Sequence, residues 1–142
     1  MGRILAIDYG KKRVGIAVSD PLKLIAIPLK TINTIDSLRF LKTYMQQEDV
    51  DTLVIGVPKK LNNTSSPMTV TVIKFIEKLQ ANFPDTYIVT QDERFSSKFA
   101  LISMIEAGFK KKDRRDKANL DKISAAIILQ SFLTRHYSQT EL

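Results

Sequence analysis

The chain has 142 residues, of which 44% are hydrophobic and 26% are charged, proportions that exclude disorder over most of its length. This length fits one domain of common size, so we expect a single domain over residues 1–142. Lysine and arginine total 22 against 15 acidic residues, a formal net charge of +7. That surplus favours a polyanionic partner such as nucleic acid; a basic protein without such a partner is the alternative.

Cysteine is absent, which excludes disulfide scaffolds, thiolate metal sites and cysteine nucleophiles. The single histidine, His136, lies near the C-terminus, which disfavours a histidine-based zinc site and a Ser-His-Asp triad. The N-terminus has no signal-peptide layout, and no apolar run approaches the roughly 20 residues of a membrane span. We therefore expect a soluble cytoplasmic protein with no membrane partner.

The first part of the chain predicts three consecutive strands. Apolar runs at Arg3–Asp8 and Arg13–Asp20 flank a turn in which Gly10 can adopt a positive φ, so these two runs form a hairpin. A third strand follows over Leu24–Ile32. Pro28 places this strand at a sheet edge, because proline cannot donate to a hydrogen-bonded ladder.

The rest of the chain alternates helix and strand. The predicted elements are, in order, a helix over Asp36–Gln47, a strand buried on both faces over Thr52–Val57, a helix beginning at Ser66-Pro67, a strand over Thr86–Thr90, a helix capped by Ser97 and ended by Gly108, a charged loop over Lys110–Lys117, and a last helix from Asn119 or Leu120 to His136. With right-handed crossovers, this order predicts an α/β fold in which helices flank a five-stranded mixed sheet.

Two acidic residues end predicted strands. Asp8 shares a strand face with the apolar Ile4 and Ala6, where a carboxylate is costly unless a cation or hydrogen bonds compensate. Glu93 ends the fifth strand. If the first and fifth strands run parallel, both acids emerge at the carboxyl edge of the sheet, where open α/β folds bind ligands. Capping of the following turn is the structural alternative for Asp8.

A third acid, Asp121, begins the core-facing stripe of the last helix. Ala125, Ile128 and Phe132 follow it at +4, +7 and +11, so the acid lies on the inward face. A favourable interaction with the helix N-terminus is the alternative explanation, since we expect Asp121 in the first turn.

Three carboxylates at the ends of elements that pack on one sheet have the donor atoms for one or two Mg²⁺ or Mn²⁺ ions. Such ions activate a water molecule and stabilise the leaving oxygen of a phosphodiester. Asp8, Glu93 and Asp121 are therefore the candidate catalytic and metal-binding residues.

Four segments, in this order along the chain, resemble motifs of the YqgF (RuvX-like) family. Asp8–Ala17 (DYGKKRVGIA) resembles its opening motif and Ile55–Pro58 (IGVP) its fourth-strand motif. Asp92–Ser97 (DERFSS) resembles its acid-Glu-Arg segment, and Asp121–Ala126 with Ile128–Gln130 resembles its last helix. The similarity spans nearly the whole chain.

The resemblance implies a ribonuclease H-like fold related to Holliday-junction resolvases, with Asp8, Glu93 and Asp121 as its acidic triad. It also implies a nuclease that matures the 5′ end of pre-16S rRNA. The chain departs from the family after Pro58, where Asn62-Asn63-Thr64 replaces an Asp-Gly-containing loop.

Nine basic residues are candidate nucleic-acid contacts. Those expected to position phosphates are Lys11, Lys12, Arg13 and Arg94, and those expected to grip the backbone at a distance are Lys110, Lys111, Lys112, Arg114 and Arg115. An ion pair is the alternative for Arg94, and a solvated loop is the alternative for the charge run.

The leading hypothesis is a metal-dependent endonuclease acting on RNA, with pre-rRNA and ribosomal precursor particles as partners. A Holliday-junction resolvase, a nucleic-acid-binding module without turnover, and an ATPase of the actin and sugar-kinase type are the alternatives. The last of these needs a second phosphate motif that the sequence lacks. The sequence leaves open RNA or branched DNA as substrate, the cut position, one metal or two, and a monomer or a homodimer.

Overall fold

A computed structural model describes residues 2–57, 67–92 and 117–136 of the chain. The elements in these ranges are β1 (Arg3–Tyr9), β2 (Arg13–Ser19), β3 (Ala26–Asn33), the 3-10 helix η1 (Thr34–Asp36), α1 (Ser37–Gln47), β4 (Val50–Val57), α2 (Pro67–Asn82), β5 (Tyr87–Asp92) and α5 (Lys117–His136). None of these helices combines the length and apolarity that crossing a bilayer requires. The predicted helix from Ser97 to Gly108 lies outside the described residues.

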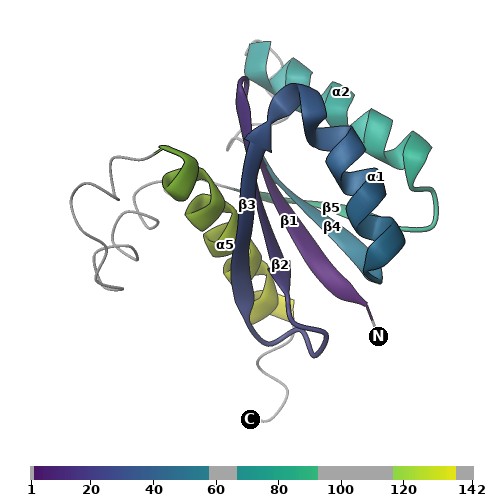
Figure 1. The fold of residues 1–142 in the computed structure, drawn as a ribbon, viewed down its shortest axis with the longest axis vertical. Helices are drawn as coiled ribbons and strands as arrows, with labels where there is room; N and C mark the ends of the chain where they lie inside the picture. Colours follow the sequence, from purple (N-terminus) through teal and green to yellow (C-terminus); the bar gives the residue numbers. More distant parts are fainter. Residues whose placement is uncertain (1, 58–66, 93–116, 137–142) are drawn as a thin grey trace.

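The five strands form one mixed sheet in the order β3-β2-β1-β4-β5. β2 pairs antiparallel with both β1 and β3, whereas β4 pairs parallel with both β1 and β5. In Figure 1, α1 and α2 lie on one face of this sheet and α5 lies on the other. The arrangement confirms the predicted α/β architecture and the predicted place of the Pro28 strand at an edge.

Each face of the sheet has its own hydrophobic core. Along β1, Ile4 and Ala6 pack against α5, while Leu5 and Ile7 pack against the α1 and α2 side, and all four side chains are fully buried. β4 is likewise buried on both faces, which confirms the prediction from its unbroken apolar run. Full burial of one such aliphatic side chain stabilises the fold by about 1.5–3 kcal/mol.

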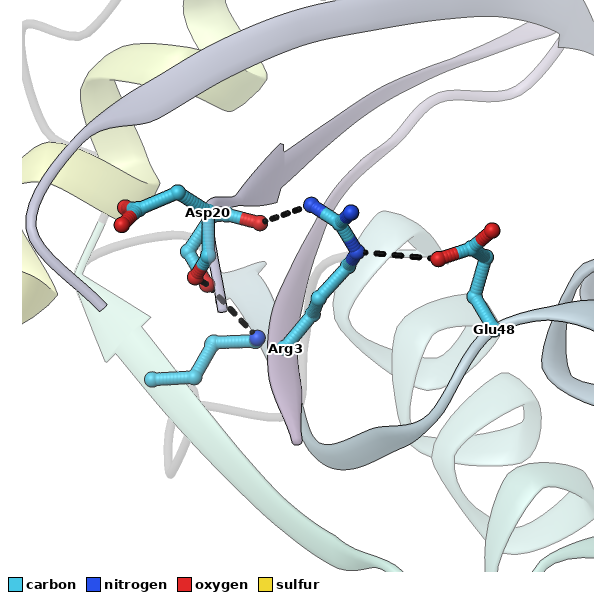
Figure 2. A network of polar contacts seen from close by, with 5 residues as sticks. Arg3, Asp20 and Glu48 are labelled. Atoms are coloured by element: carbon cyan, nitrogen blue, oxygen red, sulfur yellow. Dashed lines mark hydrogen bonds and ion pairs between the residues drawn. The ribbon is translucent and has the colours of Figure 1, made fainter. Parts of the chain in front are cut away.

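Polar contacts hold the amino end of β1 in place (Figure 2). Arg3 Nε donates to Glu48 Oε1 at 3.0 Å, and Arg3 Nη1 donates to the carbonyl oxygen of Ser19 at 3.0 Å. The buried Ser19 Oγ accepts a hydrogen bond from the backbone N–H of Ile4 at 2.9 Å. The start of β1 is thereby tied both to the end of β2 and to the connection between α1 and β4.

β3 begins at Ala26, two residues later than the sequence predicts, because Asp20 binds the amides that precede it. The Asp20 carboxylate accepts hydrogen bonds from the backbone N–H groups of Leu22, Leu24 and Ile25 at 3.1, 2.8 and 2.8 Å. These groups form a closed loop around one carboxylate, as aspartate does in turns, instead of extending the strand.

The turn between β1 and β2 needs Gly10 for close approach, and not for the positive φ that we predicted. A Cβ added there would lie 2.5 Å from the carbonyl oxygen of Arg13. Thr34 holds the same turn, because its N–H donates to the Lys12 carbonyl at 3.0 Å and its Oγ1 donates to the Gly10 carbonyl at 2.7 Å. Among the described residues other than glycine, positive φ occurs at Lys23, where φ is 61°.

α5 begins at Lys117, earlier than the predicted start at Asn119 or Leu120. Lys117 therefore belongs to the helix and not to the charged loop, in keeping with the good helix propensity of lysine and of the alanine that follows it. The predicted position of Asp121 in the first turn is wrong, since the first turn of α5 contains no acidic residue. A helix-dipole explanation for Asp121 is weakened, because that interaction falls off beyond the first turn.

The Asp20 loop predicts a stability that depends on pH. The hydrogen bond from the Ile25 amide is the largest cause that lowers the pKa of Asp20 below 3.8; desolvation opposes it, and the Leu24 and Leu22 amides add to it. A lowered folded pKa contributes stability above the unfolded pKa and loses it as the pH falls through the folded value. We expect wild type to unfold at a higher temperature than Asp20→Asn at about pH 6, and this gap to shrink below about pH 4. Thermal unfolding of both proteins across this pH range measures the difference in unfolding temperature. A difference that stays constant with pH would contradict a stabilising role for the ionised Asp20 carboxylate.

Candidate functional site

Asp8 lies near the carboxyl end of β1, on the sheet face that α5 covers. It continues the alternation of Ile4 and Ala6, whose side chains are buried against α5. Its partners in register are Gly15 on β2 and Gly56 on β4, so the residues beside it on both neighbouring strands have no side chain. The half-buried carboxylate of Asp8 thus stands where the adjacent strands leave space on that face.

The backbone of α5 lies directly against Gly15 of β2. A Cβ added to Gly15 would overlap the backbone carbonyl oxygen of Asp121 and would lie 3.0 Å from the backbone nitrogen of Lys122. Any other residue would push the helix away, so glycine is required here for close approach. Gly15 is also the register partner of Asp8, so Asp8 and Asp121 both neighbour this glycine, Asp8 through strand pairing and Asp121 through its backbone carbonyl.

The side of α5 that continues from Asp121 is buried, as predicted. Ala125, Ile128 and Phe132 are 0, 2 and 8% exposed and belong to the core between α5 and the sheet. The Asp121 side chain, at the start of this stripe, is 26% exposed. The inward orientation that the sequence predicts for Asp121 is therefore confirmed.

Arg13 forms an ion pair with Asp121 that the sequence does not reveal. Arg13 Nε donates to Asp121 Oδ2 at 2.7 Å, with the two side chains 37 and 26% exposed. Arg13 is the first residue of β2 and shares a face with Gly15, two positions further on. We predicted a phosphate contact for Arg13; the structure gives its Nε a carboxylate partner that it holds in one orientation.

Gln91 extends the same row of residues to β5. It pairs in register with Gly56, which itself pairs with Asp8. Gln91 is 5% exposed, and its Nε2 donates to Ser131 Oγ of α5 at 3.0 Å. Gln91 is not among the residues predicted from the sequence, although its alternation with Val89, which packs against the α5 core, is a signal that could have found it.

Seven of the predicted site residues lie outside the described ranges: Glu93, Arg94, Lys110, Lys111, Lys112, Arg114 and Arg115. β5 ends at Asp92, directly before Glu93 in the sequence. Both β1 and β5 run parallel to β4, so the predicted parallel relation of the first and fifth strands is confirmed. Within the described ranges, no group of three acidic or histidine side chains is placed to hold a metal ion.

The remaining predicted contacts, Lys11 and Lys12, are exposed in the turn between β1 and β2. This turn connects the strand that carries Asp8 to the strand that carries Arg13 and Gly15. Both ammonium groups are therefore presented at the end of the sheet where the two acids lie. His136 lies at the other end of α5, with its ring 4.3 Å from that of Phe132, as expected for a helix-end residue.

Comparison with known sequences gives a family and close relatives. A family model described as RuvX, Holliday junction resolvase, matches residues 2–135. A protein of Amoebophilus asiaticus named "Putative pre-16S rRNA nuclease" is 56% identical over 140 residues, which cover 96% of this chain and 99% of the relative. A protein of Flavobacterium psychrophilum with the same name is 50% identical over 135 residues, covering 95 and 98% of the two chains.

Among solved structures, RuvC of T. thermophilus in complex with a Holliday junction substrate is similar to this chain. The TM-score is 0.56 at 14% sequence identity, and the match covers 97% of this chain and 98% of that one. At this identity the likeness concerns the fold. It confirms the predicted ribonuclease H-like fold.

The contact at Gly15 predicts the effect of adding one methyl group. We expect Gly15→Ala to lower the free energy of unfolding by about 2 kcal/mol or more, because the backbone of α5 must move to relieve the overlap. Urea denaturation measures this change. An unchanged midpoint and slope would show that α5 does not rest on Gly15.

The Arg13–Asp121 pair predicts a coupling that a double-mutant cycle can measure. With Arg13→Ala and Asp121→Ala, we expect a coupling of about 1 kcal/mol in the free energy of unfolding, because both side chains are partly shielded. The matched control is the ion pair between Arg39 and Asp36, whose side chains are 79 and 39% exposed. Its coupling should be about 0.3 kcal/mol. Equal coupling energies in the two cycles would contradict the claim that partial shielding strengthens the Arg13–Asp121 pair.

Proposed function

Because the chain belongs to the RuvX family of Holliday junction resolvases, we propose that it is a metal-dependent endonuclease that processes the 5′ end of pre-16S rRNA. The family and the names of the relatives support a nuclease, that is, a hydrolase of phosphodiester bonds. The coverage of nearly the whole chain means that this activity is carried by the same domain in the relatives.

The observation that carries the proposal is the meeting of Asp8 and Asp121 at Gly15. The two acids come from opposite ends of the sequence, and the packing of α5 on β2 brings them to one place. Asp8 is half-buried and the Asp121 side chain is 26% exposed, and carboxylates withdrawn from water in this way are costly for stability alone. Such an arrangement is typical of sites that bind cations for chemistry on phosphate esters.

We propose Asp8, Asp121 and Glu93 as the ligands of Mg²⁺ or Mn²⁺. The described part of this donor set fits such hard cations, because it offers carboxylate oxygens and no sulfur or imidazole. When bound, the metal supplies an activated water and stabilises the leaving oxygen. Arg13 limits the rotation of the Asp121 carboxylate by binding Oδ2, which leaves Oδ1 for another partner.

The basic residues supply the binding of the phosphate backbone in this proposal. Lys11 and Lys12 are exposed beside the acidic site and would contact phosphates next to the cut. Arg94 and the run from Lys110 to Arg115 would add contacts further away. Their net effect is an affinity that falls steeply with salt, because each neutralised phosphate releases counterions.

With pre-rRNA or ribosomal precursor particles as its partner, the protein would act in the cytoplasm. It would act as a monomer or a homodimer. Holliday junction resolution is the second candidate function, and the description of the matching family favours it. A resolvase needs two sites related by the two-fold symmetry of the junction, so this candidate requires a homodimer.

The test is cleavage of a 5′-extended small-subunit rRNA precursor in Mg²⁺ or Mn²⁺, with wild type beside Asp8→Asn. We expect site-specific cutting by wild type that stops on addition of a chelator and falls by at least about 100-fold in the variant. Asp85→Asn is the matched control. This variant makes the same chemical change at an exposed residue before the amino end of β5, whereas Asp8 lies near the carboxyl end of β1. It should cut like wild type.

Two outcomes would contradict the proposal. Equal cutting by wild type and Asp8→Asn would place the activity elsewhere. Tight, salt-sensitive binding of the precursor without any cutting would support a binding module, unless a four-way DNA junction is cut under the same conditions.

A further inference from the structure

An open hollow of about 530 Å³ lies between β3 and α1, on the side of the sheet that α1 covers, and Arg13 is part of its lining. The residues of its lining that matter here are Arg13, Lys30, Asn33, Asp36, Arg39 and Phe40. Arg13 belongs to both places, because it lines the hollow and binds Asp121 through Nε. A ligand that reaches both the hollow and Asp121 would therefore pass Arg13.

The hollow has an excess of positive charge. Arg13, Lys30 and Arg39 line it, against the single acid Asp36. Arg39 Nη2 donates to Asp36 Oδ1 at 2.7 Å, but the Arg39 side chain is 79% exposed. An ion pair as exposed as this contributes little to stability, so Arg39 can exchange its carboxylate for a phosphate at small cost.

The ring of Phe40 positions the ammonium group of Lys30 at the hollow. Lys30 Nζ lies 5.7 Å from the centroid of the Phe40 ring, within the range of a cation–π interaction. Tyr44 stacks on Phe40 with centroids 5.9 Å apart, which supports the ring from within α1. Lys30 is otherwise exposed, so its ammonium is positioned but remains accessible to an anion.

Two hydrogen bonds tie the start of η1, beside the hollow, to the turn between β1 and β2. Thr34, at the start of η1, donates to the carbonyl groups of Lys12 and Gly10 in the turn between β1 and β2. The same turn separates the strand of Asp8 from the strand of Arg13. These two hydrogen bonds fix the start of η1 against the turn between β1 and β2.

We propose that this hollow binds one nucleotide of a single-stranded RNA segment that flanks the bond to be cut, with Lys30 and Arg39 on its phosphate groups. This inference rests on the proposed function. The volume falls within the range of about 300–1,000 Å³ for sites that take small ligands. The exposed amide of Asn33 adds a donor and an acceptor for a base edge, which only an unpaired nucleotide presents freely.

The experiment measures binding of a short single-stranded RNA that ends at the mature 5′ end, by fluorescence anisotropy over a series of salt concentrations. All proteins carry Asp8→Asn, so that binding is read without cutting. We expect the double variant Lys30→Ala/Arg39→Ala to bind about tenfold more weakly. Its salt slope should fall by about 0.7 for each lost phosphate contact.

The matched control is Lys42→Ala/Lys74→Ala, which removes the same charge from exposed positions of α1 and α2 away from the hollow. We expect this control to bind nearly as tightly as the parent. Equal losses in the two double variants would overturn the proposal, because the effect would then be one of net charge alone. A loss confined to duplex RNA or to a four-way DNA junction would overturn the assignment to a single strand.

Cleavage assays separate this inference from the proposed function. In the background with Asp8 intact, Lys30→Ala/Arg39→Ala should raise KM for the precursor about tenfold while kcat stays near that of wild type. If wild type cuts but KM does not change, the hollow is not a subsite and the nuclease proposal stands. If wild type does not cut but the loss of single-strand binding is specific to the hollow, the nuclease proposal fails and the RNA-binding assignment stands.

Discussion

The close contact between the backbone of α5 and Gly15 is the constraint on which the site depends. A helix normally packs on a sheet at a distance set by side chains, but here the backbone carbonyl oxygen of Asp121 lies so close to Gly15 that any Cβ there would overlap it. Burial of the apolar stripe of α5 stabilises the packing of this helix on the sheet. Gly15 has no side chain, so the first turns of α5 can approach β2 closely. The result is that Asp121 reaches the level of Asp8, which pairs with the same glycine.

This contact also explains why a polar row crosses an otherwise apolar face. Gly15, Asp8, Gly56 and Gln91 are neighbours in register across β2, β1, β4 and β5. Two of them are glycines and two carry polar side chains, at the level where the cores of Ile4 and Ala17 have ended. The row lies near the carboxyl end of β1, which is where α/β sheets place their ligand sites.

Charge is arranged around this row in a way that suits a polyanionic substrate. Arg13 restrains Asp121, while the exposed Lys11 and Lys12 stand at the same end of the sheet. Lys30 and Arg39 add positive charge at the hollow between β3 and α1. Basic residues of this kind attract phosphate from a distance, and a metal bound at the proposed acidic site would reduce the repulsion between the acids and phosphate.

The sequence by itself determined the order of the described strands and helices, the two-faced burial of β4, the edge position of β3 and the inward face of Asp121, because these follow from local periodicity and from proline chemistry. It also pointed to Asp8 through the cost of an acid on an apolar strand face. Only the tertiary structure decided the Arg13–Asp121 pair, the role of Gly15 and the hollow beside β3. These depend on strand register and on how deeply a distant helix docks. No local pattern records either quantity, since both depend on contacts between separate elements, and Arg13 and Asp121 are 108 positions apart along the chain.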